Sequence, residues 1–454
     1  MSEHDVIVIG AGPAGEVSAG RLADEGLDVC LVERELVGGE CAFWACMPSK
    51  ALLRPGELLA EVARVPGAAE AVTGDLDPQA VLDRRDQVIH DLDDAVQMPW
   101  LEDRSITLVR GQARLDGERR VVVGDELLQA RRAVVIATGS GAAIPPIPGL
   151  AEISPWTNRL GTTSKQVPER LTVLGGGAVG CELAQAWSSL GAKVTLVEAL
   201  TALLPTEEPF ASELLEGALR AFGVDVRTGA KAVQAARRDG KLELTLEHGE
   251  TLISDELLVA VGRTPHTGDL GLETVDLAPG KTIGVDDRMR VPTHQDWLYA
   301  VGDVNGRALL TQAGKYQAAI ACATIMNREA HALWDEGLTP RVAFTEPQVA
   351  SVGYTLAEAL EQGLAARAVD ADPGATPGAS FLGKGAPSGA RIVVDERRSV
   401  IVGATLVGPD VAESLQAATF AIVGEVPLPR LAHAMPAFPT RSEVWLKLLA
   451  DWAP

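Results

Sequence analysis

Apolar and polar positions follow the same order in two distant parts of the chain. Residues 6–9 form an apolar run, a stretch with helical spacing follows, and residues 29–33 form a second run that ends in an acid. Residues 171–174 and 194–198 repeat this order about 165 positions later. Each copy predicts a buried strand, a covering helix and a second parallel strand.

Glycines fill the turn between the first strand and the helix in both copies. The spacing is Gly-x-Gly-x-x-Gly, and an acid lies 23 residues after the first glycine each time. Such glycines let a pyrophosphate approach the helix N-terminus, and the acid can accept hydrogen bonds from a ribose. The residues are Gly10, Gly12, Gly15 and Glu33 in the first copy and Gly175, Gly177, Gly180 and Glu198 in the second.

Other elements can be placed by the same reasoning. A strand closed by glycine follows each copy, at residues 134–139 and 257–263. The sequence also indicates a helical excursion at 78–97, a strand-rich stretch at 106–128, and strands at 391–394 and 400–406. We therefore expect an α/β protein with two tandem Rossmann-like dinucleotide-binding domains and a C-terminal α+β domain.

Cys41 and Cys46 lie directly after the first nucleotide-binding pattern and are preceded by Gly38 and Gly39. An isolated pair at this spacing is more often structural, but its position beside a bound dinucleotide favours a redox-active pair. An ideal helix would hold residues i and i+5 too far apart for a disulfide. We therefore expect a distorted helix start, which two glycines allow.

Charge and composition exclude several classes of partner. The 62 acidic and 40 basic residues give a net charge of −22, which argues against binding to nucleic acid or to an anionic membrane. With no apolar run of 18 residues and no targeting segment recognised, we expect a cytoplasmic protein without membrane insertion. Cys30, Cys181 and Cys322 are expected in the core, and no cluster has the spacing of metal ligands.

At this point the chain resembles the class I pyridine nucleotide–disulfide oxidoreductases, which include dihydrolipoamide dehydrogenase, glutathione reductase and mercuric reductase. The resemblance extends over nearly all 454 residues. Besides the two glycine patterns and the cysteine pair, the matching segments are Pro48-Ser49-Lys50, Ala137-Thr138-Gly139, Gly262-Arg263-Thr264-Pro265, Tyr299-Ala300-Val301-Gly302-Asp303, Phe344-Thr345-Glu346-Pro347, Ala350-Ser351-Val352-Gly353 and Pro439-Thr440-Arg441-Ser442-Glu443.

The resemblance implies an FAD-binding domain made of residues 1–152 and 269–338, an NAD(P)-binding domain of residues 153–268, and a dimerisation domain of residues 339–454. It also implies a homodimer whose active site is shared between subunits. The implied FAD site comprises Gly10, Gly12, Gly15, Glu33, Gly39, Lys50, Ala113, Thr138, Gly139, Gly302, Asp303 and Thr311. The implied nicotinamide nucleotide site comprises Gly175, Gly177, Gly180, Glu182, Glu198, Gly262 and Arg263.

The same resemblance implies an electron path from the nicotinamide through FAD to a Cys41–Cys46 disulfide. Cys46 would be the sulfur next to the flavin, and Cys41 the one that exchanges with the substrate. Lys50 matches a lysine near the flavin, and Glu182 the glutamate that pairs with it. We expect a helix N-terminus and Lys50 to lower the pKa values of the two thiols.

Glu198 bears on the choice of nucleotide. A carboxylate at the end of the second strand favours the ribose 2′-hydroxyl of NAD and repels the 2′-phosphate of NADP. Residues 199–203 contain no arginine or lysine that could bind this phosphate. The sequence therefore favours NADH.

Two segments depart from the family pattern. Phe438 stands where the family has its catalytic histidine, although Glu443, the partner of that histidine, is present. A general base typically contributes about 10²–10⁴-fold, so the departure bears directly on activity. His433 is an alternative base, although a solvent-exposed histidine is the simpler interpretation. Between the cysteines, Phe43 and Trp44 either pack in the core or form an apolar site able to stack a flat ring.

Three functions fit these features. The preferred one is an NADH-dependent flavoprotein that passes electrons to a non-standard small-molecule acceptor, namely a quinone, a small disulfide or another electrophile. The second is a dedicated disulfide or dithiol oxidoreductase in which water, Glu443 or His433 handles the proton. The third is a non-catalytic flavin-binding sensor. Mercuric reductase itself is disfavoured, because we recognise neither its N-terminal cysteine-containing metal domain nor its C-terminal cysteine pair.

Overall fold

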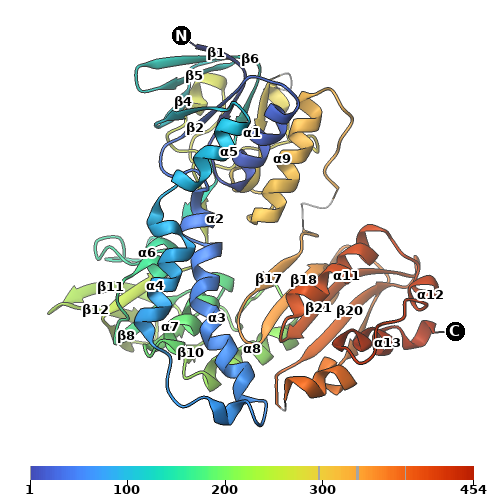
Figure 1. Cartoon of the computed structure of the whole chain (residues 1–454). Coiled ribbons are helices and arrows are strands. Elements are labelled where there is room, and N and C mark those ends of the chain that lie inside the picture. Colours follow the sequence, from blue (N-terminus) through green and yellow to red (C-terminus); the bar gives the residue numbers. More distant parts are fainter. Residues whose placement is uncertain (1, 295–296, 334–336, 384, 454) are drawn as a thin grey trace. The chain divides into compact units, whose positions relative to one another are not determined.

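The computed structural model describes residues 2–294, 297–333, 337–383 and 385–453 (Figure 1). The chain divides into two compact units. Unit 1 contains residues 1–48, 86–142 and 263–339, and unit 2 contains residues 49–85, 143–262 and 340–454. The division of the chain into three functional domains stays a prediction.

Unit 1 is built on a seven-stranded sheet with the strand order β3-β2-β1-β6-β5-β4, in which β16 also pairs with β6. The parallel strands are β1 (Ser2–Ile9), β2 (Val29–Glu33), β3 (Thr107–Arg110), β6 (Glu126–Ile136) and β16 (Leu298–Ala300). The antiparallel strands are β4 (Ala113–Leu115) and β5 (Arg120–Val123). Both faces of β1 are buried, which explains its uninterrupted apolar run.

Helices cover this sheet, and two of them contribute residues to the candidate redox site. The helices within unit 1 are α1 (Pro13–Asp24), α2 (Gly39–Phe43), α5 (Met98–Asp103) and α9 (Thr311–Ile325). Figure 1 shows α1 and α9 side by side, and a Cβ added at Gly314 would lie 3.3 Å from the Cβ of Ala14. The two helices therefore meet at their first turns. A two-stranded sheet, β7 (Ser140–Ala142) with β15 (Arg263–Pro265), completes the unit.

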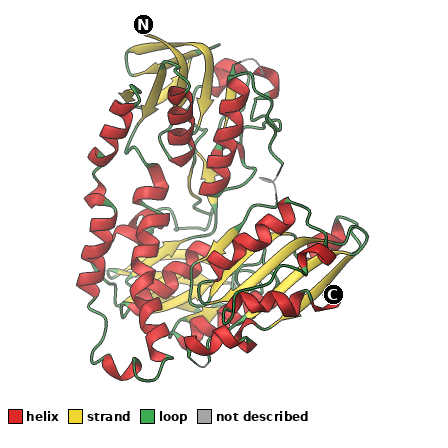
Figure 2. Ribbon diagram, turned by 45° about the vertical axis from the view of Figure 1, so that its right-hand side comes forward, coloured by secondary structure: helices red, strands yellow, loops and turns green. Residues whose placement is uncertain are grey.

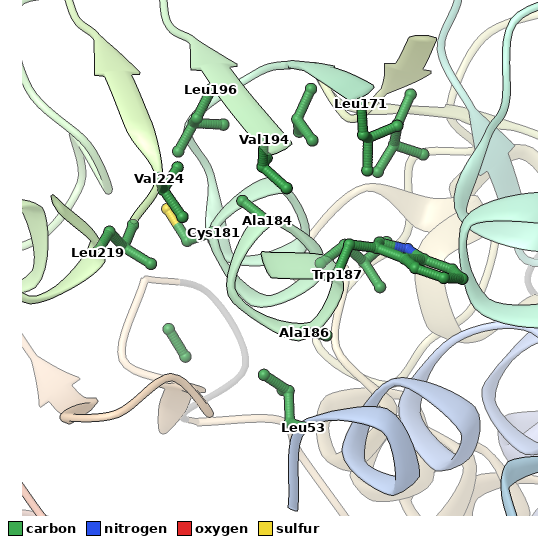
Figure 3. Packing of buried hydrophobic residues seen from close by; sticks show 14 of the residues in the cluster. Leu53, Leu171, Cys181, Ala184, Ala186, Trp187, Val194, Leu196, Leu219 and Val224 are labelled. Carbon is green, nitrogen blue, oxygen red and sulfur yellow. The ribbon is translucent and has the colours of Figure 1, made fainter. Parts of the chain in front are cut away.

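Unit 2 contains the second nucleotide-binding pattern on an all-parallel sheet of order β10-β9-β8-β14. A three-stranded antiparallel sheet follows. Figure 3 shows part of the core of this unit, in which Trp187 and Cys181 project from α7 among apolar side chains. The elements are α6 (Asn158–Thr163), β8 (Arg170–Leu174), α7 (Ala178–Ser189), β9 (Lys193–Val197), α8 (Pro209–Ala221), β10 (Asp225–Arg227), β11 (Ala232–Arg238), β12 (Lys241–Leu246), β13 (Thr251–Ser254) and β14 (Glu256–Val259).

The C-terminal part of unit 2 is a five-stranded antiparallel sheet of order β17-β18-β21-β20-β19 with helices against it (Figure 2). Its elements are β17 (Arg341–Ala343), β18 (Gln348–Gly353), α10 (Leu356–Glu361), β19 (Ala366–Ala371), β20 (Gly389–Asp395), β21 (Val400–Gly408), α11 (Val411–Val423), α12 (Leu428–Leu431) and α13 (Val444–Leu448). The alternation of strands and helices is the α+β arrangement that the sequence predicted.

Two helices cross the boundaries between the units along the chain, α3 (Cys46–Ala63) and α4 (Pro78–Val88). The helical excursion predicted for residues 78–97 is shorter than expected. His90, Asp91 and Leu92 all adopt positive φ angles, which an α-helix does not tolerate, so only short 3₁₀ turns follow Val88.

The cysteine and membrane predictions can also be compared with the structure. Cys30, Cys181 and Cys322 are buried, as predicted. Within the described ranges, no group of three or more histidine, cysteine, aspartate or glutamate residues could hold a metal ion. Among those same residues, no helix has the length and apolarity required to cross a membrane.

Candidate redox site

The first glycine turn is shaped so that only glycine fits. Gly10 has φ +99°, and a Cβ added at Gly15 would lie 1.8 Å from the carbonyl oxygen of Gly10. The turn therefore brings backbone amides to the start of α1 with no side chain in front of them. Such a helix start attracts a pyrophosphate.

Glu33 stands at the end of β2 beside this turn. Its carboxylate accepts hydrogen bonds from the backbone N–H groups of Ala11 and Glu35, both at 2.7 Å. An ionised carboxylate has about four acceptor positions, so two remain for the hydroxyls of a ribose. The carboxylate also lines a cavity of about 60 Å³.

The predicted FAD residues from other segments line the same cavity. Gly10, Ala113 and Thr138 contribute to its wall together with Gly111 and His266, neither of which the sequence predicted. The backbone amides, the Glu33 carboxylate and the cavity that it lines fit the adenosine half of FAD. His266 could have been suspected only from its position just after the matched Gly262–Pro265 segment.

Asp303 forms a compact polar cluster with two residues of the small β7–β15 sheet. The Ser140 hydroxyl donates to Asp303 at 2.5 Å, and the Arg263 Nε donates to that hydroxyl at 2.6 Å. Arg263 also lies 3.3 Å from the Asp303 carboxylate. Arg263, assigned to the nicotinamide site by resemblance, thus lies beside a predicted FAD residue, and Ser140 is a further member that sequence reasoning missed. Gly302 and Gly139, both with positive φ angles, flank this cluster in sequence.

The second glycine turn reproduces the first in atomic detail. A Cβ added at Gly180 would lie 1.9 Å from the carbonyl oxygen of Gly175, whose φ is +113°. The Glu198 carboxylate accepts from Gly176 N–H at 2.6 Å and from Leu200 N–H at 2.7 Å, the same pattern as at Glu33. A second dinucleotide site is thus supported by geometry. Gly177 and Gly262 lie in the turn and after β14 respectively.

The cysteine pair lies at a break between two helices. Cys41 is in α2, which ends at Phe43, and Cys46 is the first residue of α3. Trp44 between them has φ −133° and ψ 0°, and Gly38 and Gly39 at the start of α2 have φ +115° and +60°. The helix is therefore interrupted between the two cysteines, as a disulfide at this spacing requires. The two glycines before Cys41 adopt positive φ angles, which agrees with the distorted helix start that we expected.

Cys41 and Cys46 are free thiols in this structure and share a hydrogen bond with each other. The Cys46 Sγ also lies 3.6 Å from the hydroxyl of Thr311, the first residue of α9. The two sulfurs thus adjoin each other, as a dithiol that could form a disulfide must. Thr311, predicted at the FAD site, contacts Cys46 of the cysteine pair itself.

The electrostatics of Cys41 correct one prediction. The hydrogen bond with Cys46 and then burial raise the pKa of Cys41, whereas Thr311 and the ammonium of Lys315 act in the opposite direction. The expected lowering by Lys50 is not seen for this thiol. The ammonium of Lys50 instead forms an ion pair with Glu182, whose Oε2 lies 2.7 Å from the Lys50 Nζ.

The predicted pairing of Lys50 with Glu182 is therefore present, and the surroundings of Glu182 show why it holds. Glu182 is 4% exposed, and its other carboxylate oxygen accepts the backbone N–H of Phe344 at 2.9 Å. The Lys50 ammonium lies 4.7 Å from the centre of the Phe344 ring. The buried carboxylate of Glu182 on α7 is thus held by residues from α3 and from the chain after β17.

The C-terminal segment contains the residues at which the sequence departs from the family pattern, and two of them lie at the surface. Phe438 is 76% exposed, and His433 is also exposed. One carboxylate oxygen of Glu443 is buried and has no hydrogen-bond partner among the described residues. This oxygen of Glu443 could therefore accept a further hydrogen bond.

Known proteins match the chain over almost its whole length. The family model described as pyridine nucleotide-disulphide oxidoreductase matches residues 4–323, and the model of its dimerisation domain matches residues 339–449. A mercuric reductase of Shigella flexneri is 35% identical over 98% of this chain and 80% of its own length. A dihydrolipoyl dehydrogenase of Thermus scotoductus is 33% identical over 98% and 96%.

A solved structure agrees with these sequence matches. The HOCl-induced flavoprotein disulfide reductase RclA from Escherichia coli has a TM-score of 0.86 at 25% identity, covering 98% of this chain and 99% of its own. The chain therefore belongs to the pyridine nucleotide–disulfide oxidoreductase family, a family of NAD(P)H-dependent flavoenzymes that use FAD.

Proposed function

We propose that this enzyme takes electrons from NADH through FAD and the Cys41–Cys46 pair and gives them to a non-standard small-molecule acceptor. The observation that carries the proposal is the hydrogen-bonded thiol pair at the break between α2 and α3, next to Thr311 and in the unit that holds the first nucleotide turn. Bound FAD would supply the chemistry that accepts a hydride and passes its two electrons on, so that a disulfide can be reduced.

The acceptor is proposed to be a quinone, a small disulfide or another electrophile. Phe438 replaces the usual base, so a reaction that depends on histidine at that position is disfavoured. Phe43 is buried and its ring lies 5.8 Å from that of Trp44, which adds aromatic surface beside Cys41. The names of the relatives, mercuric reductase and flavoprotein disulfide reductase, describe acceptors that react with thiols, which favours an electrophile of this kind.

A dedicated disulfide reductase remains the second proposal. Glu443 keeps a buried oxygen free of hydrogen bonds among the described residues, so it could bind a proton directly. His433 is exposed and could serve the same purpose. Both groups lie within five residues of Phe438, where the base is missing.

The decisive experiment compares acceptors on one enzyme preparation. NADH added without oxygen should bleach the flavin, which a non-catalytic sensor would not show. Steady-state rates are then measured with a quinone and with a small disulfide. A high quinone rate that persists in Cys41→Ser would show that electrons pass straight from the flavin to the quinone. The thiols would then not belong to the main electron path.

The preference for NADH is proposed from the end of β9. Glu198 directly follows β9, and Arg227 on the adjacent strand lies 2.9 Å from Asp225 and 3.6 Å from Glu250. A 2′-phosphate would therefore meet a carboxylate and no free arginine at these positions. We expect kcat/KM for NADH to exceed that for NADPH by at least about tenfold, and Glu198→Ala to narrow this ratio. A wild-type enzyme that prefers NADPH would refute this assignment.

A further inference from the structure

Arg263 makes contacts that its expected role does not explain. The resemblance assigns this residue to the nicotinamide nucleotide site, but its guanidinium holds Ser140 at two points. The Arg263 Nε donates to the Ser140 hydroxyl at 2.6 Å, and a terminal nitrogen donates to the Ser140 carbonyl oxygen at 2.6 Å. Both residues lie in unit 1, which contains the first nucleotide turn.

Ser140 connects Arg263 to Asp303. Ser140 is 2% exposed, and its hydroxyl donates to the Asp303 Oδ2 while it accepts from Arg263. The Arg263 Nε itself lies 3.3 Å from the same Oδ2. Among the described residues, the Asp303 carboxylate uses only Oδ2 in these contacts, so its Oδ1 can accept a hydrogen bond from a ligand.

The backbone beside Asp303 is held from another direction. The N–H of Gly302 donates at 2.7 Å to the side-chain oxygen of Gln317, a fully buried residue of α9. The same helix begins at Thr311, which contacts the Cys46 sulfur. The main chain at Asp303 is therefore anchored to α9, whereas its side chain is oriented by Ser140 and Arg263 from β7 and β15.

We propose that Arg263 is a positioning residue of the FAD site, which acts through Ser140 and Asp303, and that it is not a ligand of the nicotinamide nucleotide. Its positive charge offsets that of the Asp303 carboxylate, which would otherwise repel the diphosphate of FAD. The Ser140 hydroxyl fixes Oδ2, so that Oδ1 stays available to a hydroxyl of the cofactor. The inference concerns the binding of FAD and does not depend on the proposed acceptor.

The test measures the binding of both nucleotides to one holoenzyme. Release of FAD after dilution is followed by the fluorescence of free flavin, and binding of NAD⁺ to FAD-saturated enzyme is measured by calorimetry. Arg263→Met should accelerate FAD release at least about tenfold, because hydrogen bonds to a charged group are lost. The dissociation constant for NAD⁺ should change less than about twofold. FAD release at the wild-type rate, or an equally large loss of NAD⁺ affinity, would overturn the proposal.

Further variants test whether Arg263 acts through its two neighbours. Arg263→Lys keeps the charge and should release FAD more slowly than Arg263→Met, while Ser140→Ala should accelerate release. In an Asp303→Asn background, either Arg263→Met or Ser140→Ala should add less than about twofold, since residues of one hydrogen-bonded network are not additive. Fully additive effects would contradict the proposal. If Arg263→Met does not fold, Ser140→Ala in the two backgrounds gives the decision.

Arg290 provides a matched control in the same unit. Its Nε donates to Asp286 at 2.8 Å, and its side chain is 27% exposed, compared with 23% for Arg263. Arg290→Met should release FAD at the wild-type rate. Equal acceleration in Arg290→Met and Arg263→Met would indicate a general loosening of unit 1 and refute the specific role. FAD release requires neither NADH nor an acceptor, so an enzyme that reduces neither quinone nor disulfide would refute the proposed function while this test remains readable.

Discussion

Phe438 stands where the resemblance to the family leads us to expect a histidine. Its exposed ring cannot carry a proton, while Glu443 five residues later keeps an oxygen without a hydrogen-bond partner among the described residues. Phe438→His should restore an imidazole that Glu443 can orient. We expect turnover of a small disulfide to rise by about 10–100-fold and quinone reduction to change little.

A histidine introduced at the neighbouring Met435, which is 92% exposed, provides the control for this substitution. Met435→His should leave both rates unchanged. If wild type already reduces a disulfide rapidly and His433→Ala abolishes that activity, the base has moved to His433.

Residues that could be predicted are those whose role follows from local sequence. Glu33 and Glu198 lie at fixed distances from their glycines, and both accept the hydrogen bonds that such a turn offers. The contact of Thr311 with the Cys46 sulfur could not be predicted, since it brings together residues 265 positions apart in the sequence. The raised pKa of Cys41 was also missed, because it arises from the neighbouring thiol and from burial.

At the scale of elements, the two glycine turns offer a matched pair of substitutions. Gly15→Ala would place a Cβ 1.8 Å from the Gly10 carbonyl oxygen, and Gly180→Ala would place one 1.9 Å from that of Gly175. We expect Gly15→Ala to lose FAD and become colourless. Gly180→Ala should stay yellow but resist reduction by NADH, while dithionite still bleaches it. Absorbance spectra before and after each reductant measure both effects.

The control for this pair is Gly217→Ala in α8, where an added Cβ meets nothing within 4 Å. Alanine has the higher helix propensity, so this variant should keep both colour and NADH reduction. If Gly180→Ala also lost FAD, the two turns would not act as independent sites.

The periodicity of the sequence located several strands to within a few residues. The strand predicted at 29–33 is β2, and the one at 400–406 is β21 (Val400–Gly408). Strands with continuous apolar runs are recognisable because both of their faces are buried. The end of α4 was missed, because three consecutive left-handed residues without glycine leave no clear signal in the sequence.

At the scale of the whole molecule, the C-terminal part of unit 2 exposes several large apolar side chains. Phe420 and Val423 on α11 are 69% and 47% exposed, and Met435 and Phe438 follow in the same part of the chain. Exposed apolar surface of this kind is typical of subunit contacts. The match to a dimerisation domain over residues 339–449 agrees with this interpretation.

We therefore expect a homodimer that a single charge on this surface can separate. Phe420→Asp should shift the mass measured by light scattering toward that of a monomer, because an unpaired charge in an apolar interface is strongly unfavourable. Leu160→Asp on α6, where the leucine is 51% exposed, is the matched control and should stay dimeric. If the active site is shared, the Phe420→Asp monomer keeps FAD and is bleached by NADH but loses acceptor turnover. A monomer with full acceptor turnover would instead show that one chain suffices.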